Sequence, residues 1–379
     1  MDHRLDPHTR ERTISPNRHR EREVKDNLGG STKLWAALAV SALALTACGG
    51  GGGSGGGNSN TVAQTTSACT ISGGPFVAIS LTGQVGQAQF SNGGSTLTYS
   101  SYPSSFTNNT LSGSLDLIQD PNNTGVCMDK GSATNSMRTT IQSSGIIGIS
   151  HATVNGTDEP VILLAQSALA SNSVSNLAGT YDLLRYQTDT TNGGETRSSY
   201  ATLSVSNSGW SMCKNTPSCS SPTATGTFNP LAGSSVEFEF ASGGLVRGDS
   251  FIVNDGASQI LVTAEHDTGS GLVQGLHFGL AQAPWSPLSG PYAVNTTDGV
   301  AQQTIVYGRS AVSGSGSTPV PLTTDSPIQG LATATAADGV TLDYLLASPS
   351  GLLVDVSNTG NNFTGGPGFL AFGIVPPTH

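Results

Sequence analysis

The sequence predicts an all-β protein, with two or three small antiparallel β-barrel or β-sandwich units after a disordered N-terminal tether. Residues 236–240 alternate apolar and charged side chains, the period of a strand that buries one face. Apolar runs at 251–253 and 260–262 flank Asn254-Asp255-Gly256, whose chemistry favours a hairpin turn. After residue 67, no apolar stripe with helical periodicity exceeds two turns.

The remaining local signals agree with this fold class. Turn residues at 337–339 and 348–351 precede the apolar segments 340–344 and 352–354. Only residues 165–177 are compatible with one short helix, and a plain linker explains them equally well.

A weak repeat divides the folded part into three β units, 68–173, 174–285 and 286–379. A small residue precedes Phe76, Tyr181 and Tyr292, aromatic positions that lie 105 and 111 residues apart. Each unit then ends in an apolar strand, at 161–166, 277–282 and 369–375. Duplication of one unit would produce this pattern, although chance in a low-complexity composition remains the alternative.

The N-terminal region carries targeting signals and no fold. Residues 1–27 are densely charged and nearly free of apolar side chains, so we expect them to be disordered. If translation starts near Val24 or Leu28, they are not part of the protein at all. Residues 34–44 are uncharged but too few to cross a bilayer, which takes about 20 residues, and their length suits the apolar core of a signal peptide.

The segment Leu45-Thr46-Ala47-Cys48 resembles the lipobox of bacterial lipoproteins. The resemblance implies that residues 28–47 are a signal peptide and that Cys48 becomes the lipidated first residue, carrying diacylglycerol and usually a further acyl chain such as palmitate. Because Gly49 and not Asp follows Cys48, it also implies the outer membrane of a Gram-negative cell. Whether the protein faces the periplasm or the outside stays open.

Residues 48–67 consist mainly of Gly, Ser, Asn and Thr, a composition that behaves as a flexible coil. We interpret this segment as a tether between the anchor and the folded part.

Charge excludes two classes of partner. From Cys48 onward the chain has 7 Lys and Arg against 19 Asp and Glu, a net charge of −12. Nucleic-acid binding needs a basic surface, and adsorption to anionic lipid needs one as well. The expected partners are therefore the membrane, through the lipid on Cys48, and an unidentified ligand or protein.

Four further cysteines indicate an oxidising compartment: Cys69, Cys127, Cys213 and Cys219. Three pairings are possible. The short 213–219 loop can close on itself, which leaves Cys69 for Cys127. A zinc site is the alternative, but no Cys-x-x-Cys pair or clustered histidines accompany these residues.

Gly179-Thr180-Tyr181, at the start of a predicted strand, is faintly similar to the opening motif of lipocalin-type barrels. The Trp and the downstream basic motif of that family are absent. Closed barrels and sandwiches therefore both remain open.

One motif suggests catalysis. Asp267-Thr268-Gly269-Ser270 resembles the active-site signature of pepsin-like aspartic peptidases, in which two aspartates share a proton. The second aspartate would have to be Asp325 or Asp189, and neither has the matching context. Because the motif lies between two predicted strands, an ordinary hairpin loop explains it, so we expect no enzyme and treat Asp267 only as a weak catalytic candidate.

No cofactor or metal is expected. Residues 265–267 could ligate a metal, but neighbours on a strand point to opposite faces. His277 lies in an apolar strand and is interpreted as a packed side chain. Oxygen atoms of the kind that Ca²⁺ prefers are offered near turns by Asp116, Asp120, Asn122, Asn123 and Asp129. Their spacing matches no EF-hand, and turn chemistry explains them.

Two hypotheses of function follow. The first is a lipid-anchored envelope protein, without enzymatic activity, whose β units bind a ligand or partner or act structurally. The alternative is an envelope hydrolase that uses Asp267.

Overall fold

The computed structural model describes residues 67–102, 111–131, 136–154, 156–189, 195–266, 273–297, 299, 301–314, 317–335, 342–358 and 369–377. The predicted signal peptide, Cys48, almost all of the predicted tether and the Asp267–Ser270 motif lie outside these residues, so the predictions made for them stay predictions.

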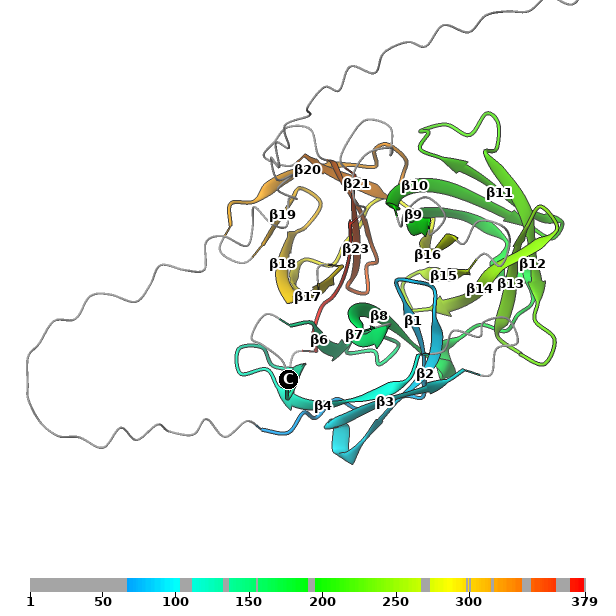
Figure 1. The fold of residues 1–379 in the computed structure, drawn as a ribbon. Helices are drawn as coiled ribbons and strands as arrows, with labels where there is room; N and C mark the ends of the chain where they lie inside the picture. The colour runs from blue at the N-terminus through cyan, green and yellow to red at the C-terminus, as the bar shows by residue number, and fades with distance from the viewer. Residues whose placement is uncertain are drawn as a thin grey trace, which may run out of the picture. The chain divides into compact units, whose positions relative to one another are not determined.

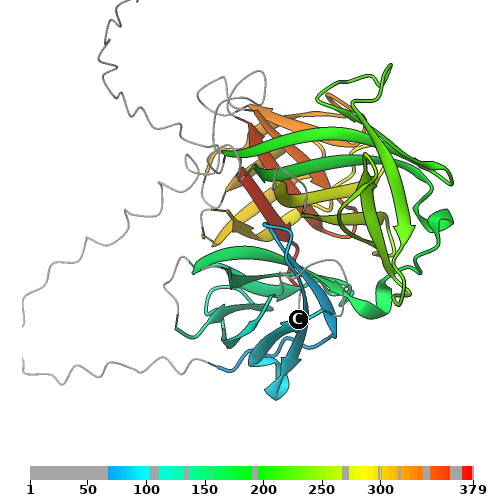
Figure 2. The ribbon, with the colours of Figure 1, turned by 45° about the vertical axis from the view of Figure 1, so that its right-hand side comes forward.

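The described chain forms three closed eight-stranded antiparallel barrels (Figures 1 and 2). The first contains β1 (Phe76–Ser80), β2 (Val85–Ser91), β3 (Thr96–Ser101), β4 (Gly113–Gln119), β5 (Val126–Asp129), β6 (Arg138–Ile141), β7 (Ile147–Val154) and β8 (Thr157–Ala165). The second contains β9 (Gly179–Asp189), β10 (Glu195–Ser206), β11 (Gly209–Lys214), β12 (Ala224–Pro230), β13 (Glu237–Ser242), β14 (Leu245–Asn254), β15 (Gln259–His266) and β16 (Val273–Ala281). The third contains β17 (Gly290–Thr296), β18 (Ala301–Tyr307), β19 (Ala311–Gly314), β20 (Val320–Thr324), β21 (Leu331–Thr335), β22 (Leu342–Ala347), β23 (Leu352–Asn358) and β24 (Phe369–Ile374).

The all-β prediction is confirmed, and the open choice between barrels and sandwiches is decided in favour of barrels. Within each barrel, consecutive strands pair antiparallel and the last strand pairs with the first, so no sheet edge remains. The apolar segments 161–166, 277–282 and 369–375 belong to these closing strands, β8, β16 and β24. All described residues belong to one compact unit, so the division into three separate domains stays a prediction.

The three barrels begin in the same way. A glycine stands two residues before Phe76, Tyr181 and Tyr292, and its φ is +99°, +154° and +135° respectively, values that favour glycine. Each aromatic ring is fully buried. The hydroxyls of Tyr181 and Tyr292 each donate to the carbonyl four residues upstream, at 3.1 and 2.8 Å. The Gly-x-aromatic pattern therefore marks the entry of the chain into a barrel.

Between the first two barrels the chain forms a linker with two short helical turns, η2 (Gln166–Ala168) and α2 (Val174–Leu177). This agrees with the short helix or linker expected at 165–177.

Each barrel has its own apolar interior, and a further core joins the barrels. The joint core consists of outward-facing side chains of β1, β7 and β8, of β9, β10 and β14–β16, and of β21–β24. Phe278 of the second barrel contacts Phe372 of the third, with ring centroids 6.3 Å apart. Tyr102, after β3, packs edge-on against Phe251 of the second barrel at 5.7 Å.

The predicted hairpin at 251–262 is confirmed as β14 and β15, and its turn makes a contact that the sequence did not predict. The Asp255 carboxylate accepts the backbone N–H groups of Ala257 and Ser258 at 2.9 and 2.6 Å. It also accepts hydrogen bonds from the hydroxyls of Ser348, at 2.5 Å, and Ser350. The turn of one barrel is thus joined to the 348–351 turn of the next.

The alternating segment 236–240 forms β13, as predicted, but its charged residues do not both face water. Phe238 and Phe240 point into the barrel, whereas Glu237 on the opposite face is fully buried. That face lies near Tyr102, whose pKa is raised to about 12 by burial and then by the charges of Glu237 and Asp249. Packing between barrels therefore overrides the expectation that a charged residue marks an exposed face.

The disulfide prediction is confirmed. Cys69 pairs with Cys127 and so links the segment before β1 to β5, and Cys213 pairs with Cys219 across the start of the β11–β12 connection.

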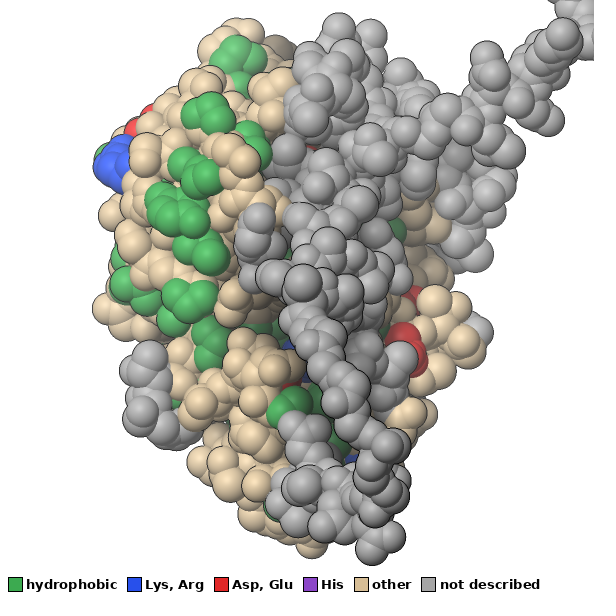
Figure 3. Space-filling view, turned by 90° about the vertical axis from the view of Figure 1, so that its left-hand side faces the viewer, with side chains coloured by type: hydrophobic (Ala, Val, Ile, Leu, Met, Phe, Trp, Pro, Cys, Tyr) green, Lys and Arg blue, Asp and Glu red, His purple; other side chains and the backbone are tan. Residues whose placement is uncertain are grey.

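The surface is poor in charge. Figure 3 shows one face on which uncharged polar groups and scattered apolar side chains far outnumber acidic and basic ones. Among the described residues, no helix has the length and apolar character needed to cross a membrane.

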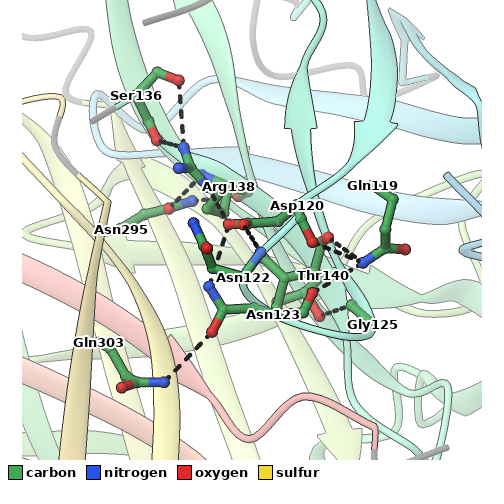
Figure 4. A network of polar contacts seen from close by, with 11 residues as sticks. Gln119, Asp120, Asn122, Asn123, Gly125, Ser136, Arg138, Thr140, Asn295 and Gln303 are labelled. Atoms are coloured by element: carbon green, nitrogen blue, oxygen red, sulfur yellow. Dashed lines mark hydrogen bonds and ion pairs between the residues drawn. The ribbon is translucent and has the colours of Figure 1, made fainter. Parts of the chain in front are cut away.

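Asn295 of β17 links the third barrel to the first (Figure 4). Its Oδ1 accepts the backbone N–H of Arg138 at 2.8 Å. Its Nδ2 donates to the carbonyl oxygens of Arg138 and Ser150, at 2.7 and 2.9 Å. Asn295 is fully buried, and its side-chain amide both donates and accepts hydrogen bonds, as a backbone peptide group does. In this way it connects the two barrels.

We predict that Asn295→Ala lowers the free energy of unfolding by about 2–4 kcal/mol, because it removes three hydrogen bonds, two to the partly buried backbone of Arg138 and one to the buried carbonyl of Ser150. Gln303→Ala is the matched control on the neighbouring strand. Its side chain makes one long contact, at 3.5 Å to Asn123, and we expect a change below about 0.5 kcal/mol. Urea unfolding of both variants tests this, and equal stability of the two would contradict the role given to Asn295.

Candidate functional site

The interior of the second barrel changes from apolar to polar along its strands. On β9, Tyr181 and Leu183 belong to the barrel core, whereas Arg185, Gln187 and Asp189 on the same face line a cavity. The polar half of the interior therefore opens at the end of the barrel where β9 ends and β10 begins.

This cavity, which we call the barrel-2 mouth, has a volume of about 270 Å³. Its lining residues are Arg185, Gln187, Asp189, Arg197, Trp210, Met212, Lys214, Ala224, Phe240, Ser242, Arg247, Glu265, Val273 and His277. Trp210 and Phe240 stack with ring centroids 4.9 Å apart, which gives the cavity an apolar aromatic wall.

Three buried titratable side chains lie at the base of the mouth. His277 Nε2 lies 2.7 Å from Glu265 Oε2, a distance that requires a proton between them, so Nε2–H donates to the carboxylate. Arg185 is almost completely buried, with its Nη2 3.7 Å from the same oxygen and its Nε 3.1 Å from His277 Nε2. Gln187 donates a further hydrogen bond to Glu265.

These contacts determine the charge states. Burial acts to raise the pKa of Glu265, but His277, Arg185 and Gln187 outweigh it and the pKa lies well below its usual range. Burial and the Arg185 charge lower the pKa of His277 to about 4. At pH 7 the carboxylate is therefore ionised and the imidazole neutral.

Lys214 is the distinctive cation of the mouth. It stands at the end of β11, where its backbone N–H donates to Thr223 Oγ1 at 3.1 Å. In the described part of the chain, its ammonium has no hydrogen bond or ion pair. Burial and the nearby Arg185 lower the pKa of Lys214 to about 8, against a smaller opposing effect of Glu265.

The mouth gathers most of the positive charge that follows Cys48 in the sequence. Four of the seven basic residues that follow Cys48 line it: Arg185, Arg197, Lys214 and Arg247. Asp189 and Glu265 are the acidic lining residues, so the formal charge of the cavity is +2 with His277 neutral. From Cys48 onward the chain has a net charge of −12, so this is a local reversal of sign that favours an anion.

Chemically, the arrangement is suited to binding. Within the described residues, the side chains hydrogen-bonded to His277 are Arg185 and Glu265, and no serine, threonine or cysteine is among them. The described residues also contain no group of three or more His, Cys, Asp and Glu side chains that could hold a metal ion.

Of the catalytic candidates from the sequence, Asp189 and Asp325 are described, and they lie in different barrels. Asp189 lines the mouth. Asp325 belongs instead to a loop of the third barrel, where it accepts the N–H groups of Trp285 and Gly330 and pairs with Arg309 at 2.9 Å. Asp267 lies outside the described residues, in the connection between β15 and β16.

Sequence reasoning missed the cationic lining. The scarcity of basic residues argues against nucleic acid and anionic lipid as partners, but it also makes any cluster of basic residues informative. The alternation of Tyr181, Leu183 and Arg185 along one strand face was the signal that could have located the polar half of the barrel.

We predict that His277 makes stability depend on pH. Its pKa is lower in the folded chain than in the unfolded chain, so its contribution is present above about pH 6.5 and is lost as the pH falls towards 4. The free energy of unfolding of the wild type should fall between pH 7 and 4.5 by about 2 kcal/mol more than that of His277→Gln. Urea unfolding at the two pH values measures this difference, and parallel pH dependences would refute the buried neutral state of His277.

No family model and no curated protein matches this chain. Among solved structures, the H. pylori β clamp in complex with 5-chloroisatin aligns over 82% of this chain and 93% of its own, at 7% identity. The TM-score of 0.12 means that this alignment supports no argument about fold or function.

Proposed function

We propose that this chain is a non-enzymatic, lipid-anchored protein of the bacterial envelope whose second barrel binds a small organic anion. One observation carries the binding role: four of the seven basic side chains after Cys48 surround a single cavity with an aromatic wall. The rest of the chain after Cys48 is acidic and poor in charge, so this cluster of cations is a local exception.

The shape and lining of the mouth favour a carboxylate or sulfonate attached to a flat apolar group. The anionic group would approach Lys214 and the guanidinium groups, while the apolar part would lie against Trp210 and Phe240. Binding sites of this kind combine an apolar wall with a few convergent polar groups.

We expect benzoate to bind about tenfold or more tightly than benzyl alcohol or benzylamine, its neutral and cationic counterparts. Trp210 reports binding by fluorescence in a Trp285→Phe background. Lys214→Met should weaken benzoate and leave benzyl alcohol unchanged. Equal affinities for the three compounds, or an unaffected Lys214→Met variant, would refute the anion site.

The affinity for benzoate should also depend on pH. Because the pKa of Lys214 is about 8, its charge is lost between pH 7 and 9. We expect binding to weaken by roughly threefold to tenfold over this interval. Lys214→Arg keeps a positive charge at both pH values and should show little change. If benzoate binding by Lys214→Arg weakened with pH as much as binding by the wild type, a group other than Lys214 would be responsible for the pH dependence.

The anchor is supported by the Leu45–Cys48 motif and the Gly-rich segment that follows it. We propose that Cys48 carries the lipid and that the protein resides in the outer membrane, with the folded part tethered by residues 48–67. Stable attachment of this kind takes two or more acyl chains.

Cys48→Ser should move the protein from the membrane fraction to the soluble fraction of the cells that produce it, whereas Gly50→Ala, two residues away, should leave it membrane-bound. Retention of Cys48→Ser in the membrane would exclude lipid anchoring through this residue. Protease treatment of intact cells then distinguishes the two orientations, because only a protein that faces outward is cleaved.

A further inference from the structure

A second and larger cavity lies between the first and third barrels. Its volume is about 510 Å³. One wall comes from the β4–β5 turn and from β5 and β6, and the other from β17, β18 and the segment that follows β24. We call it the inter-barrel cleft. It shares no lining residue with the barrel-2 mouth.

The cleft has no uncompensated charge among its lining residues. Asp120 and Arg138 are the charged side chains that line it, and they form an ion pair with 2.9 Å between Oδ2 and Nε. Asp120 also accepts the backbone N–H of Asn122 at 2.9 Å and the side-chain amide of Asn123 at 3.2 Å. Burial opposes these bonds, but together with Arg138 they hold the pKa of Asp120 below its usual range.

The walls are rigidly connected at this point, as Figure 4 shows. Asn295 joins β17 to the backbone of Arg138, as described above. The side-chain amide of Gln119 donates to the carbonyl oxygens of Asn123 and Val126, both at 2.9 Å, and so holds the β4–β5 turn in place. Gln303 reaches across from β18 to Asn123 at 3.5 Å. The cleft is therefore preorganised, which lowers the entropic cost of binding.

Several polar side chains of the cleft are available to form hydrogen bonds with a ligand. Among the described residues, the side chains of Asn122, Thr124 and Gln302 have no hydrogen-bond partner, and all three line the cleft. A side-chain amide both donates and accepts hydrogen bonds, as does a hydroxyl. Beside these groups lies an apolar surface formed by Val126, Pro291, Val375, Pro376 and Pro377.

We propose that the inter-barrel cleft binds a neutral oligosaccharide. Sugar hydroxyls require groups that donate and accept together, which Asn122 and Gln302 supply from opposite walls. The C–H faces of a sugar ring require an uncharged apolar surface, which the prolines supply. The paired Asp120 and Arg138 leave no net charge to attract an ionic ligand, in contrast to the barrel-2 mouth.

The test uses the detergent-solubilised full chain and a printed panel of neutral gluco-, manno-, galacto- and chito-oligosaccharides, with sulfated oligosaccharides beside them. Wild type should bind at least one neutral series. The double variant Asn122→Ala/Gln302→Ala should bind that series about tenfold or more weakly. Lys214→Met is the matched control in the other cavity and should bind it as wild type does.

Both substituted residues are at least partly exposed and make no side-chain hydrogen bond within the described chain, so the double variant should keep the wild-type melting temperature. Three outcomes would overturn the proposal: no binding to any neutral oligosaccharide, unchanged binding by the double variant, or binding restricted to sulfated sugars and abolished by Lys214→Met. The last outcome would indicate that the sugar binds in the barrel-2 mouth and not in the inter-barrel cleft.

Discussion

The apolar core between the barrels is the constraint on which the rest of the structure depends. Closing a barrel satisfies the hydrogen bonds of its edge strands, but here it leaves outer faces covered with large apolar residues such as Ile79, Phe278 and Phe372. These side chains are 0–1% exposed only because the barrels cover one another. Removing any barrel would expose an apolar surface on the others, so each barrel depends on its neighbours for burial.

This constraint separates what the sequence could predict from what it could not. The hairpin at 251–262, the closing strands and the Cys213–Cys219 disulfide follow from local chemistry, and the structure contains them. Cys69–Cys127 follows as the remaining pair. The buried Glu237, the Asp255–Ser348 contact and the Asn295 link depend on which outer faces meet, and no local pattern contains that information. β24 and residues 160–165 of β8 are continuous apolar runs, because both of their faces are buried. β16 is buried on both faces over most of its length but carries His277 among its apolar residues.

The two cavities with polar lining residues that we propose as binding sites lie where the barrels do not pack against one another. One is the open end of a barrel, where interior positions of β9 and β11 carry Arg185 and Lys214. The other is the gap between two barrels, where turns meet strands. In the first, a low local dielectric strengthens each charge and lowers the pKa of Lys214. The candidate cations could not be assembled from sequence because they lie on different strands, 12 to 62 residues apart along the chain.

The disulfide Cys213–Cys219 connects the anchor hypothesis to the binding hypothesis. Lys214 directly follows Cys213, and its backbone is held on one side by this disulfide and on the other by Thr223. Thr223 in turn donates to the carbonyl of Met212, at 2.9 Å from its hydroxyl. A cation positioned in this way depends on an oxidised loop, and disulfides persist in exported proteins and not in the reducing cytosol. The Leu45–Cys48 motif implies export to an oxidising compartment. In that compartment the Cys213–Cys219 disulfide persists, and so does the position of Lys214 in the barrel-2 mouth.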